Sequence, residues 1–205
     1  MGRRIAHHDR LFSYSKIGKM KRLLFTILYF LIFIPLVAQQ LSEQEIIQKM
    51  ASAAKEIKTV QADFKQTKYM KMLAKEMVSE GKMYCQQPDK LRWEYTSPRA
   101  NVIILNGTEG SGTKNKFVRE MARLIMKLVA GQGLTDSSTF QVTAEELPTE
   151  YVATLLPLKK EMKQFYTKLV LHFDNKQSTV TEVELYEKNG DRTVIELHDI
   201  RINKN

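Results

Sequence analysis

The chain offers few residues whose type and spacing could support catalysis. The run Gly110-Ser111-Gly112 could present a serine on a flexible loop, but it lacks the GxSxG spacing of a nucleophile elbow. His172 and His198 could bind a metal, but alternating apolar residues flank each of them, which indicates the polar face of a strand. No further ligands with metal-site spacing are evident, and the acids are scattered among lysines as on a solvated surface. We therefore expect no enzyme, no metal and no cofactor.

The methionines indicate a different role, the binding of apolar molecules. Eight of the ten methionines follow residue 38, and four of these crowd one expected hairpin: Met70, Met72, Met77 and Met83. Two more, Met121 and Met126, lie in an expected helix. Methionine is unbranched and adaptable, so a surface rich in it can repack around varied apolar guests. Ordinary filling of a protein core is the alternative explanation.

The composition indicates one domain and excludes several classes of protein. The chain has 205 residues, 43% hydrophobic and 27% charged, which suffices for one domain of ordinary size. Its single cysteine excludes a disulfide framework and any multi-cysteine metal site. Much of the net charge of +9 lies in residues 1–38, which hold seven basic residues against one acid. Residues 39–205 hold 25 basic and 22 acidic residues, a net charge of +3, so we expect no nucleic-acid partner.

Residues 1–38 have the features of a secretory signal peptide. A basic stretch at 19–22 precedes fifteen uncharged and mostly apolar residues at 23–37, and the small residue Ala38 follows. A membrane-spanning helix needs roughly 20 apolar residues, which disfavours the alternative of an anchor. We expect cleavage near Ala38 and export without an attached lipid, because no cysteine follows the apolar run. Met20, rather than Met1, is the expected start, which makes residues 1–19 an upstream extension.

Hydrophobic periodicity divides residues 39–205 into helices and strands. Ser42 and Glu45 predict a capping box, after which apolar residues recur at helical spacing as far as Ile57. From Val60 the period changes to two, which indicates strands with one polar face. About nine strands are expected, the first before a hairpin loop at 71–75 and the others near 77–86, 91–95, 102–105, 140–144, 151–155, 168–173, 180–187 and 192–202. A second helix is expected at 117–128, and one more helical turn within 157–165.

Local connections between these strands favour an antiparallel meander over a parallel βαβ arrangement. A long twisted sheet tends to curl into a barrel, and its apolar face must be covered. We therefore predict an α+β fold in which residues 39–205 form an incomplete antiparallel β-barrel, a strongly curved sheet whose apolar concave face is covered by helices.

Several motifs, taken in order, resemble the outer-membrane lipoprotein carrier proteins, the LolA-like family. The segment VQADFKQ at 60–66 is similar to the family's first strand with its F-x-Q motif. GKMY at 81–84, Pro88 and LRWEYTSP at 91–98 are similar to a glycine-led strand, a proline and an aromatic strand that ends in proline. Asn106-Gly107 matches the next turn, and the tail matches from 155 onwards. The resemblance covers nearly all of residues 40–203.

This resemblance implies a periplasmic protein with a helical lid over an apolar cavity. Family members take acylated lipoproteins from an inner-membrane lipoprotein-releasing transporter and pass them to an outer-membrane acceptor. This chain departs from the family at Gln87, where better-studied members have an arginine that latches the lid, and in a shorter region after Gly107. Because related proteins handle other lipids, a glycolipid or pigment-precursor carrier and a periplasmic lipoprotein sensor are the alternatives.

Alternation along the expected strands predicts the side chains that line the cavity: Met83, Trp93, Tyr95, Ile103, Leu105, Leu169, Leu171, Phe173, Val183 and Leu185. The apolar side of the second helix predicts the lid: Met121, Leu124, Ile125 and Leu128. These lid residues are expected to fill the cavity when it holds no cargo. Burial of each side chain stabilises the closed state by roughly 1.5–3 kcal/mol, so cargo must displace them. Glutamate at Met83 or Leu124 is therefore predicted to abolish lipid loading with little loss of secretion. The alternative is that these residues are ordinary core, in which case both variants should unfold.

Overall fold

Ten antiparallel strands form one sheet within the described part of the chain. They are β1 (Thr59–Met70), β2 (Lys75–Gln86), β3 (Lys90–Ser97), β4 (Asn101–Asn106), β5 (Glu109–Ser111), β6 (Phe140–Glu146), β7 (Glu150–Pro157), β8 (Tyr166–Asp174), β9 (Val180–Glu187) and β10 (Arg192–Ile202). Their order in the sheet is β5-β4-β3-β2-β1-β10-β9-β8-β7-β6. Two meanders, β1 to β5 and β6 to β10, are therefore joined by the pairing of β1 with β10.

The computed structural model describes residues 41–107, 109–112, 116–130, 133–176 and 178–204. The chain divides into two units, Met1–Gln39 and Gln40–Asn205, and the fold described here is that of the second. The expected signal peptide and its cleavage site at Ala38 lie outside the described residues. None of the described helices has the length and apolar character that crossing a membrane requires.

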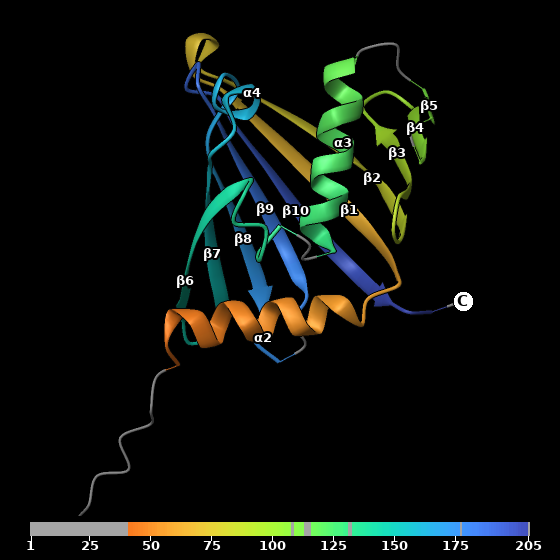
Figure 1. Cartoon of the computed structure of the whole chain (residues 1–205). Coiled ribbons are helices and arrows are strands. Elements are labelled where there is room, and N and C mark those ends of the chain that lie inside the picture. The colour runs from red at the N-terminus through yellow and green to blue at the C-terminus, as the bar shows by residue number, and fades with distance from the viewer. Residues whose placement is uncertain (1–40, 108, 113–115, 131–132, 177, 205) are drawn as a thin grey trace, which may run out of the picture. The chain divides into compact units, whose positions relative to one another are not determined.

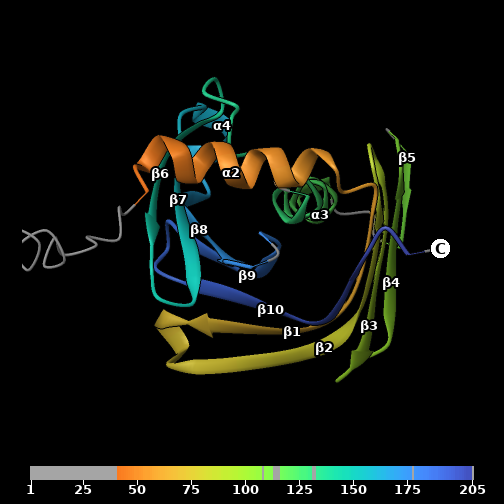
Figure 2. The ribbon, with the colours of Figure 1, turned by 90° about the horizontal axis from the view of Figure 1, so that it is seen from below.

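The sheet is strongly curved and surrounds an interior on three sides (Figures 1 and 2). In Figure 2, β6 to β8 form one side, β10, β1 and β2 form the floor, and β3 to β5 form the other side. Helix α2 (Glu43–Lys55) packs against β6 and crosses the open side at one end of the sheet. Helix α3 (Lys116–Val129) lies inside the curve, and the short helix α4 (Lys160–Lys163) lies beside β7 and β8. This is the predicted α+β fold, an incomplete barrel whose concave face is covered by helices.

The first helix begins as its sequence predicts. The backbone N–H of Ser42 donates to Glu45 Oε2 at 2.8 Å, and the backbone N–H of Glu45 donates to the Ser42 hydroxyl oxygen at 3.4 Å. This capping box satisfies donors that the first helical turn would otherwise leave unpaired. Ile46, Met50 and Ala54 are buried along one side of α2, so the same helix covers part of the apolar interior.

Replacing the capping serine measures how much this helix end stabilises the fold. Ser42→Ala is expected to lower the free energy of unfolding by about 1 kcal/mol, because loss of an N-cap side chain typically costs that much. For a domain of this size, this corresponds to a fall of roughly 2–4 °C in the midpoint of thermal unfolding. Ser52→Ala, an exposed position within the same helix, is the matched control and should leave the midpoint unchanged. An equal response from both variants would contradict a capping role for Ser42.

The sequence predicted most element boundaries within a few residues, and β9 and β10 without error. The expected count of about nine strands was one too low, because β5 consists of three exposed residues in a segment interpreted as a polar loop. The expected hairpin loop at 71–75 is shorter, a single 3-10 turn at Lys71–Leu73, with β1 and β2 paired up to Met70 and Lys75. The helical turn expected within 157–165 is α4.

Candidate functional site

The ten residues predicted to line a cavity all lie in the apolar interior of the curved sheet. Nine of them are buried and Tyr95 is partly buried against the same apolar cluster. In β8 and β9, for example, Leu169, Leu171 and Val183 are fully buried while the alternating residues between them are more exposed, apart from Val170. The structure therefore brings the predicted residues together on one face, and their role in ligand binding remains a prediction.

An aromatic cluster forms where β2 passes between β1 and β3. The ring centroids of Phe64 and Trp93 lie 4.2 Å apart, and those of Phe64 and Tyr95 lie 5.4 Å apart in an edge-on arrangement. Gly81 is the position on β2 that pairs with Phe64, and a Cβ atom there would lie 2.7 Å from Phe64 Cζ and overlap the carbonyl oxygen of Glu94. Glycine at 81 therefore allows the aromatic rings to lie directly over the strand.

Helix α3 is the element that fills the concave face. It contacts β3, β4 and β9, and its apolar side is buried in the interior. The predicted lid residues Ile125 and Leu128 are buried, whereas Met121 and Leu124 are only partly buried. The predicted lid did not include three further buried residues of this helix: Ala122, Met126 and Val129. Strand side chains alone therefore do not fill the interior, since α3 supplies much of the packing.

A small hollow remains between α3 and the floor of the sheet. It has a volume of about 240 Å³, and its lining includes the predicted cavity residues Trp93, Tyr95, Ile103 and Leu185. The Tyr95 hydroxyl donates to Gln66 Oε1 at 3.2 Å, which satisfies a polar group in this apolar space. Burial raises the pKa of Tyr95, against the hydrogen bond with Gln66 that lowers it, so this hydroxyl stays protonated at neutral pH. The hollow beneath the helix is thus mostly apolar, although Gln66, Lys68, Glu187 and Thr193 also line it, and it is incompletely filled.

A larger groove lies on the other side of α3, between this helix, α4 and the segment before β6. Its volume is about 810 Å³, within the range of small-molecule binding sites. Apolar side chains contribute to its lining: Met121, Leu124, Leu128, Phe140, Met162 and Phe165. Charged side chains of both signs also border it: Glu120, Arg123, Lys127, Asp136, Lys159 and Glu161. The groove can therefore accept an apolar chain while its charged border remains in contact with water.

Met121 and Tyr166 separate the groove from the hollow, since both residues line both spaces. The Tyr166 hydroxyl donates to the Met121 sulfur at 2.7 Å. Burial raises the pKa of Tyr166, and the nearby carboxylate of Glu187 raises it further, so the phenol remains a donor. A thioether is a weak acceptor on a flexible side chain, so this partition is easier to displace than a pair of packed strands.

The sequence also matches the model of a known protein family. The family model described as "Outer membrane lipoprotein carrier protein LolA" matches residues 55–205. The chain belongs to the LolA family. No curated protein matches the chain.

Solved structures with this fold are distant in sequence. A structure of MucB is 11% identical with a TM-score of 0.51, over 77% of this chain and 58% of MucB. The LolA superfamily protein NE2245 from Nitrosomonas europaea is 12% identical with a TM-score of 0.40, over 78% of this chain and 94% of that one. Mycobacterium tuberculosis lipoprotein LppX is 9% identical with a TM-score of 0.41, over 80% and 98% of the two chains.

Gln87 stands where the resemblance of this LolA-family chain implied a latch arginine. The side-chain amide nitrogen of Gln87 is buried and makes no hydrogen bond to any described residue. Instead, Arg123 on α3 donates from Nη1 to Glu120 and from Nη2 to the carbonyl oxygen of Gly107, at 2.9 and 3.4 Å. Arg123 is thus one tie between the helix and the sheet, beside the Tyr166–Met121 hydrogen bond and the apolar packing of α3.

The single cysteine tests the packing of the interior. Cys85 is buried on β2, and burial raises the pKa of its thiol to about 11. At pH 8 only about one such thiol in a thousand is ionised, and the thiolate is the reactive form. We expect the folded protein to resist Ellman's reagent at pH 8 and to react with one equivalent after unfolding in guanidinium. Fast labelling of the folded protein would contradict the burial of Cys85.

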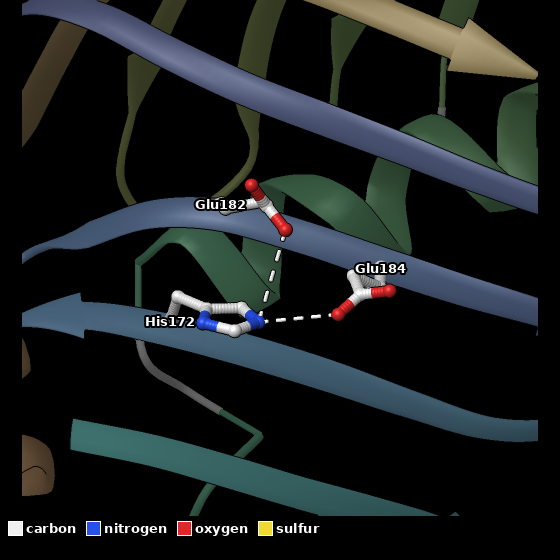
Figure 3. A group of neighbouring side chains, drawn as sticks. All are labelled: His172, Glu182 and Glu184. Carbon is white, nitrogen blue, oxygen red and sulfur yellow. Dashed lines mark hydrogen bonds and ion pairs between the residues drawn. The ribbon is translucent and has the colours of Figure 1, made fainter. Parts of the chain in front are cut away.

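The outer face of β7 to β9 carries a cluster that the sequence interpretation missed. His172 was expected on the polar face of a strand without nearby ligands, but three glutamates surround it. Its Nδ1 lies 3.0 Å from Glu150, and its Nε2 lies 3.2 Å from Glu184 and 3.7 Å from Glu182 (Figure 3). Burial lowers the pKa of His172, but the bonds to Glu150 and Glu184 outweigh that effect and raise it. His198, by contrast, is exposed as expected.

Proposed function

We propose that this protein is a periplasmic carrier that binds the acyl chains of lipoproteins in its concave interior and shuttles them towards the outer membrane. The observation that carries the proposal is the position of α3, an amphipathic helix inserted into a curved sheet with an apolar groove on one side and a hollow beneath it. Membership of the LolA family supports the same role. The partners we propose are an inner-membrane lipoprotein-releasing transporter and an outer-membrane acceptor.

The helix explains how such a carrier could release its cargo. Burial of an acyl chain stabilises the complex by about 0.8 kcal/mol per CH₂ group, so a lipid with several chains would bind too tightly to leave. Each buried α3 side chain that the lipid displaces loses roughly 1.5–3 kcal/mol of its own burial, which offsets part of that gain. An acceptor with a preformed cavity could then take the cargo without nucleotide hydrolysis, for which the sequence contains no P-loop.

The groove and the hollow support a two-step route by which an acyl chain could enter the protein. An acyl chain would first lie in the groove between α3 and α4, against Leu124 and Phe165. Displacement of Met121 from Tyr166 would join the groove to the hollow, where Trp93 and Leu185 lie. Trp93, Tyr95, Ile103 and Leu185 line that hollow, whereas the other six predicted residues are buried and would contact lipid only after the interior opens further.

A carrier of a different lipid is the second candidate, and the absent latch arginine favours it. Gln87 stands at that position and does not hold the helix, so the cargo that triggers opening can differ from that of other family members. Glycolipids and pigment precursors have apolar parts that fit the same groove. A periplasmic sensor that binds lipoproteins is compatible with the same site, and we propose no catalytic role for it.

Identification of the bound lipid separates these candidates. The full chain would be expressed in a bacterium with an outer membrane, purified from the cell envelope without detergent, and analysed by native mass spectrometry. Bound acylated lipoprotein, or its acylated N-terminal peptide, is the result expected for the proposed carrier. Bound free glycolipid would contradict the lipoprotein carrier and support a carrier of a different lipid. Turnover of an ester probe would contradict our proposal that the site has no catalytic role.

A further inference from the structure

The His172 cluster lies on the face of the sheet opposite the apolar interior. In β8 and β9 the inward residues are apolar, whereas His172, Glu182 and Glu184 occupy alternating outward positions. Strand register places His172 directly opposite Glu182, and an irregularity in the ladder follows between His172 and Phe173. The three side chains converge in Figure 3, with the Nε2 atom of the histidine facing both carboxylates. The cluster therefore stands apart from the proposed lipid site.

The distances among these three side chains fit one small metal ion. Zinc bonds to histidine nitrogen and carboxylate oxygen are about 2.0–2.1 Å long, so the edges of a zinc tetrahedron are about 3.3–3.4 Å. Nε2 of His172 lies 3.2 Å from Glu184 Oε1 and 3.7 Å from Glu182 Oε1. The ligand atoms of all three residues lie within 4.8 Å of one another. Small rotations of these side chains would place their ligand atoms at three corners of a zinc tetrahedron.

Neighbouring groups hold two of these side chains in the orientation that a metal needs. Nδ1 of His172 lies 3.0 Å from Glu150 Oε2, so its N–H can donate to that carboxylate and direct the Nε2 lone pair towards Glu182 and Glu184. The Tyr186 hydroxyl donates to Glu184 Oε2 at 2.8 Å, which leaves Oε1 of the same carboxylate facing the histidine. A carboxylate behind a ligating histidine, and a hydrogen bond to a ligating carboxylate, are typical supports of metal sites.

We propose that His172, Glu182 and Glu184 form a binding site for a first-row divalent metal ion, best suited to zinc, with Glu150 and Tyr186 as its supporting residues. One nitrogen and two carboxylate oxygens leave at least one position for water or for a ligand from a partner, which is typical of exchangeable zinc sites. An imidazole ligand favours zinc over magnesium and calcium, which prefer oxygen-only sites.

The charges around the cluster also favour a cation. Three carboxylates meet at one histidine, and among the described residues the cation paired with them is Arg192, at 3.5 Å from Glu184. Glu196 pairs with Glu182 across the strands and adds a further negative charge, although it also forms an ion pair with Lys65 at 3.2 Å. A metal at Nε2 is compatible with the remaining contact of the ring, since Nδ1–H then faces Glu150.

Zinc titration of the full, untagged chain tests the proposal. After treatment with a chelator, isothermal titration with zinc chloride should show a site with one equivalent of zinc, and magnesium chloride should not saturate it. His172→Ala should weaken zinc binding at this site at least tenfold, and the near-isosteric Glu182→Gln and Glu184→Gln should weaken it in the same direction. His198→Ala, an exposed histidine on β10, is the matched control and should bind zinc as the wild type does.

A structural readout keeps the test independent of variant folding and of lipid transport. Zinc X-ray absorption of the loaded wild-type protein should show nitrogen and oxygen ligands with the scattering pattern of one imidazole. Zinc affinity that is unchanged in both glutamine variants would overturn the proposal and leave His172 as the centre of an ion-pair cluster. The measurement needs no lipid, so failure of the carrier function and failure of the metal site are distinguishable.

Discussion

Leu124→Glu is expected to abolish lipid binding while the sheet remains folded. Leu124 lies on α3, lines the groove and is only partly buried, so the protein without lipid can hydrate a glutamate there. A bound acyl chain would remove that carboxylate from water, at a cost of several kcal/mol without a partner. We expect affinity for a fluorescent fatty-acyl probe to fall at least a hundredfold. Circular dichroism and the midpoint of thermal unfolding would show that the sheet is retained.

Two control variants make this result specific. Leu156→Glu introduces the same change on the outer face of β7, where the leucine side chain is 40% exposed, and should leave probe binding unchanged. Leu124→Met keeps an apolar side chain of similar volume in the groove and should bind the probe nearly as well as the wild type. Equal loss of binding in Leu124→Glu and Leu156→Glu would show that the groove is not the lipid site.

Met83→Glu, the corresponding change in the sheet, is not a useful test of lipid loading. The sequence suggested that glutamate at Met83 would also block lipid binding with little loss of secretion. In the structure Met83 is fully buried within the apolar core, so a glutamate there would be an unpaired charge in the core. We therefore expect Met83→Glu to prevent folding, which makes Leu124 the informative position of the two.

Gly81→Ala is expected to cause the largest loss of stability among conservative changes in the sheet. The added methyl group would meet the backbone oxygen of Glu94 and the ring of Phe64, and neither can move without disturbing β3 or the aromatic cluster. Overpacking of this kind costs about 3 kcal/mol or more. The midpoint of thermal unfolding should fall by roughly 6–12 °C, if the variant folds at all.

The neighbouring strand residue Ser79 provides the control for this change. Ser79→Ala removes a hydroxyl from β2 without adding volume, and the midpoint should change by no more than about 2 °C. Near-UV circular dichroism adds a local measurement, because the Phe64 ring lies next to Gly81 and packs against Trp93 and Tyr95. A stable Gly81→Ala variant with an unchanged aromatic spectrum would refute the close packing at this position.

The sequence predicted the fold where one face of an element is buried and the other is not. Alternation identified β9 and β10, and the ten inward residues of the sheet, because burial acts on every second side chain. The same rule failed at Glu109–Ser111, where β5 is exposed throughout and held by backbone pairing with β4. It also shortened β2, whose first residues Lys75 and Glu76 are exposed near the hairpin tip.

The missed parts of the candidate sites depend on contacts between distant segments. The groove joins α3 to Phe140 and Phe165, and no local pattern indicates that these residues share one space. The histidine cluster joins residues of β7, β8 and β9 through strand register, which the sequence alone does not determine. One indication was available, because His172, Glu182 and Glu184 all occupy outward positions of neighbouring strands in a meander.

The pairing of β1 with β10 has a consequence for how the protein is made. Each half of the sheet is built from strands that are neighbours in the chain, but this one ladder joins the earliest strand to the latest. Contacts between such distant segments form late and slowly. A nascent chain that has not yet delivered its final strand would hold two meanders with unpaired edges at β1 and β9. Such edges can pair with other chains, so the unfinished polypeptide needs protection until its last strand is in place.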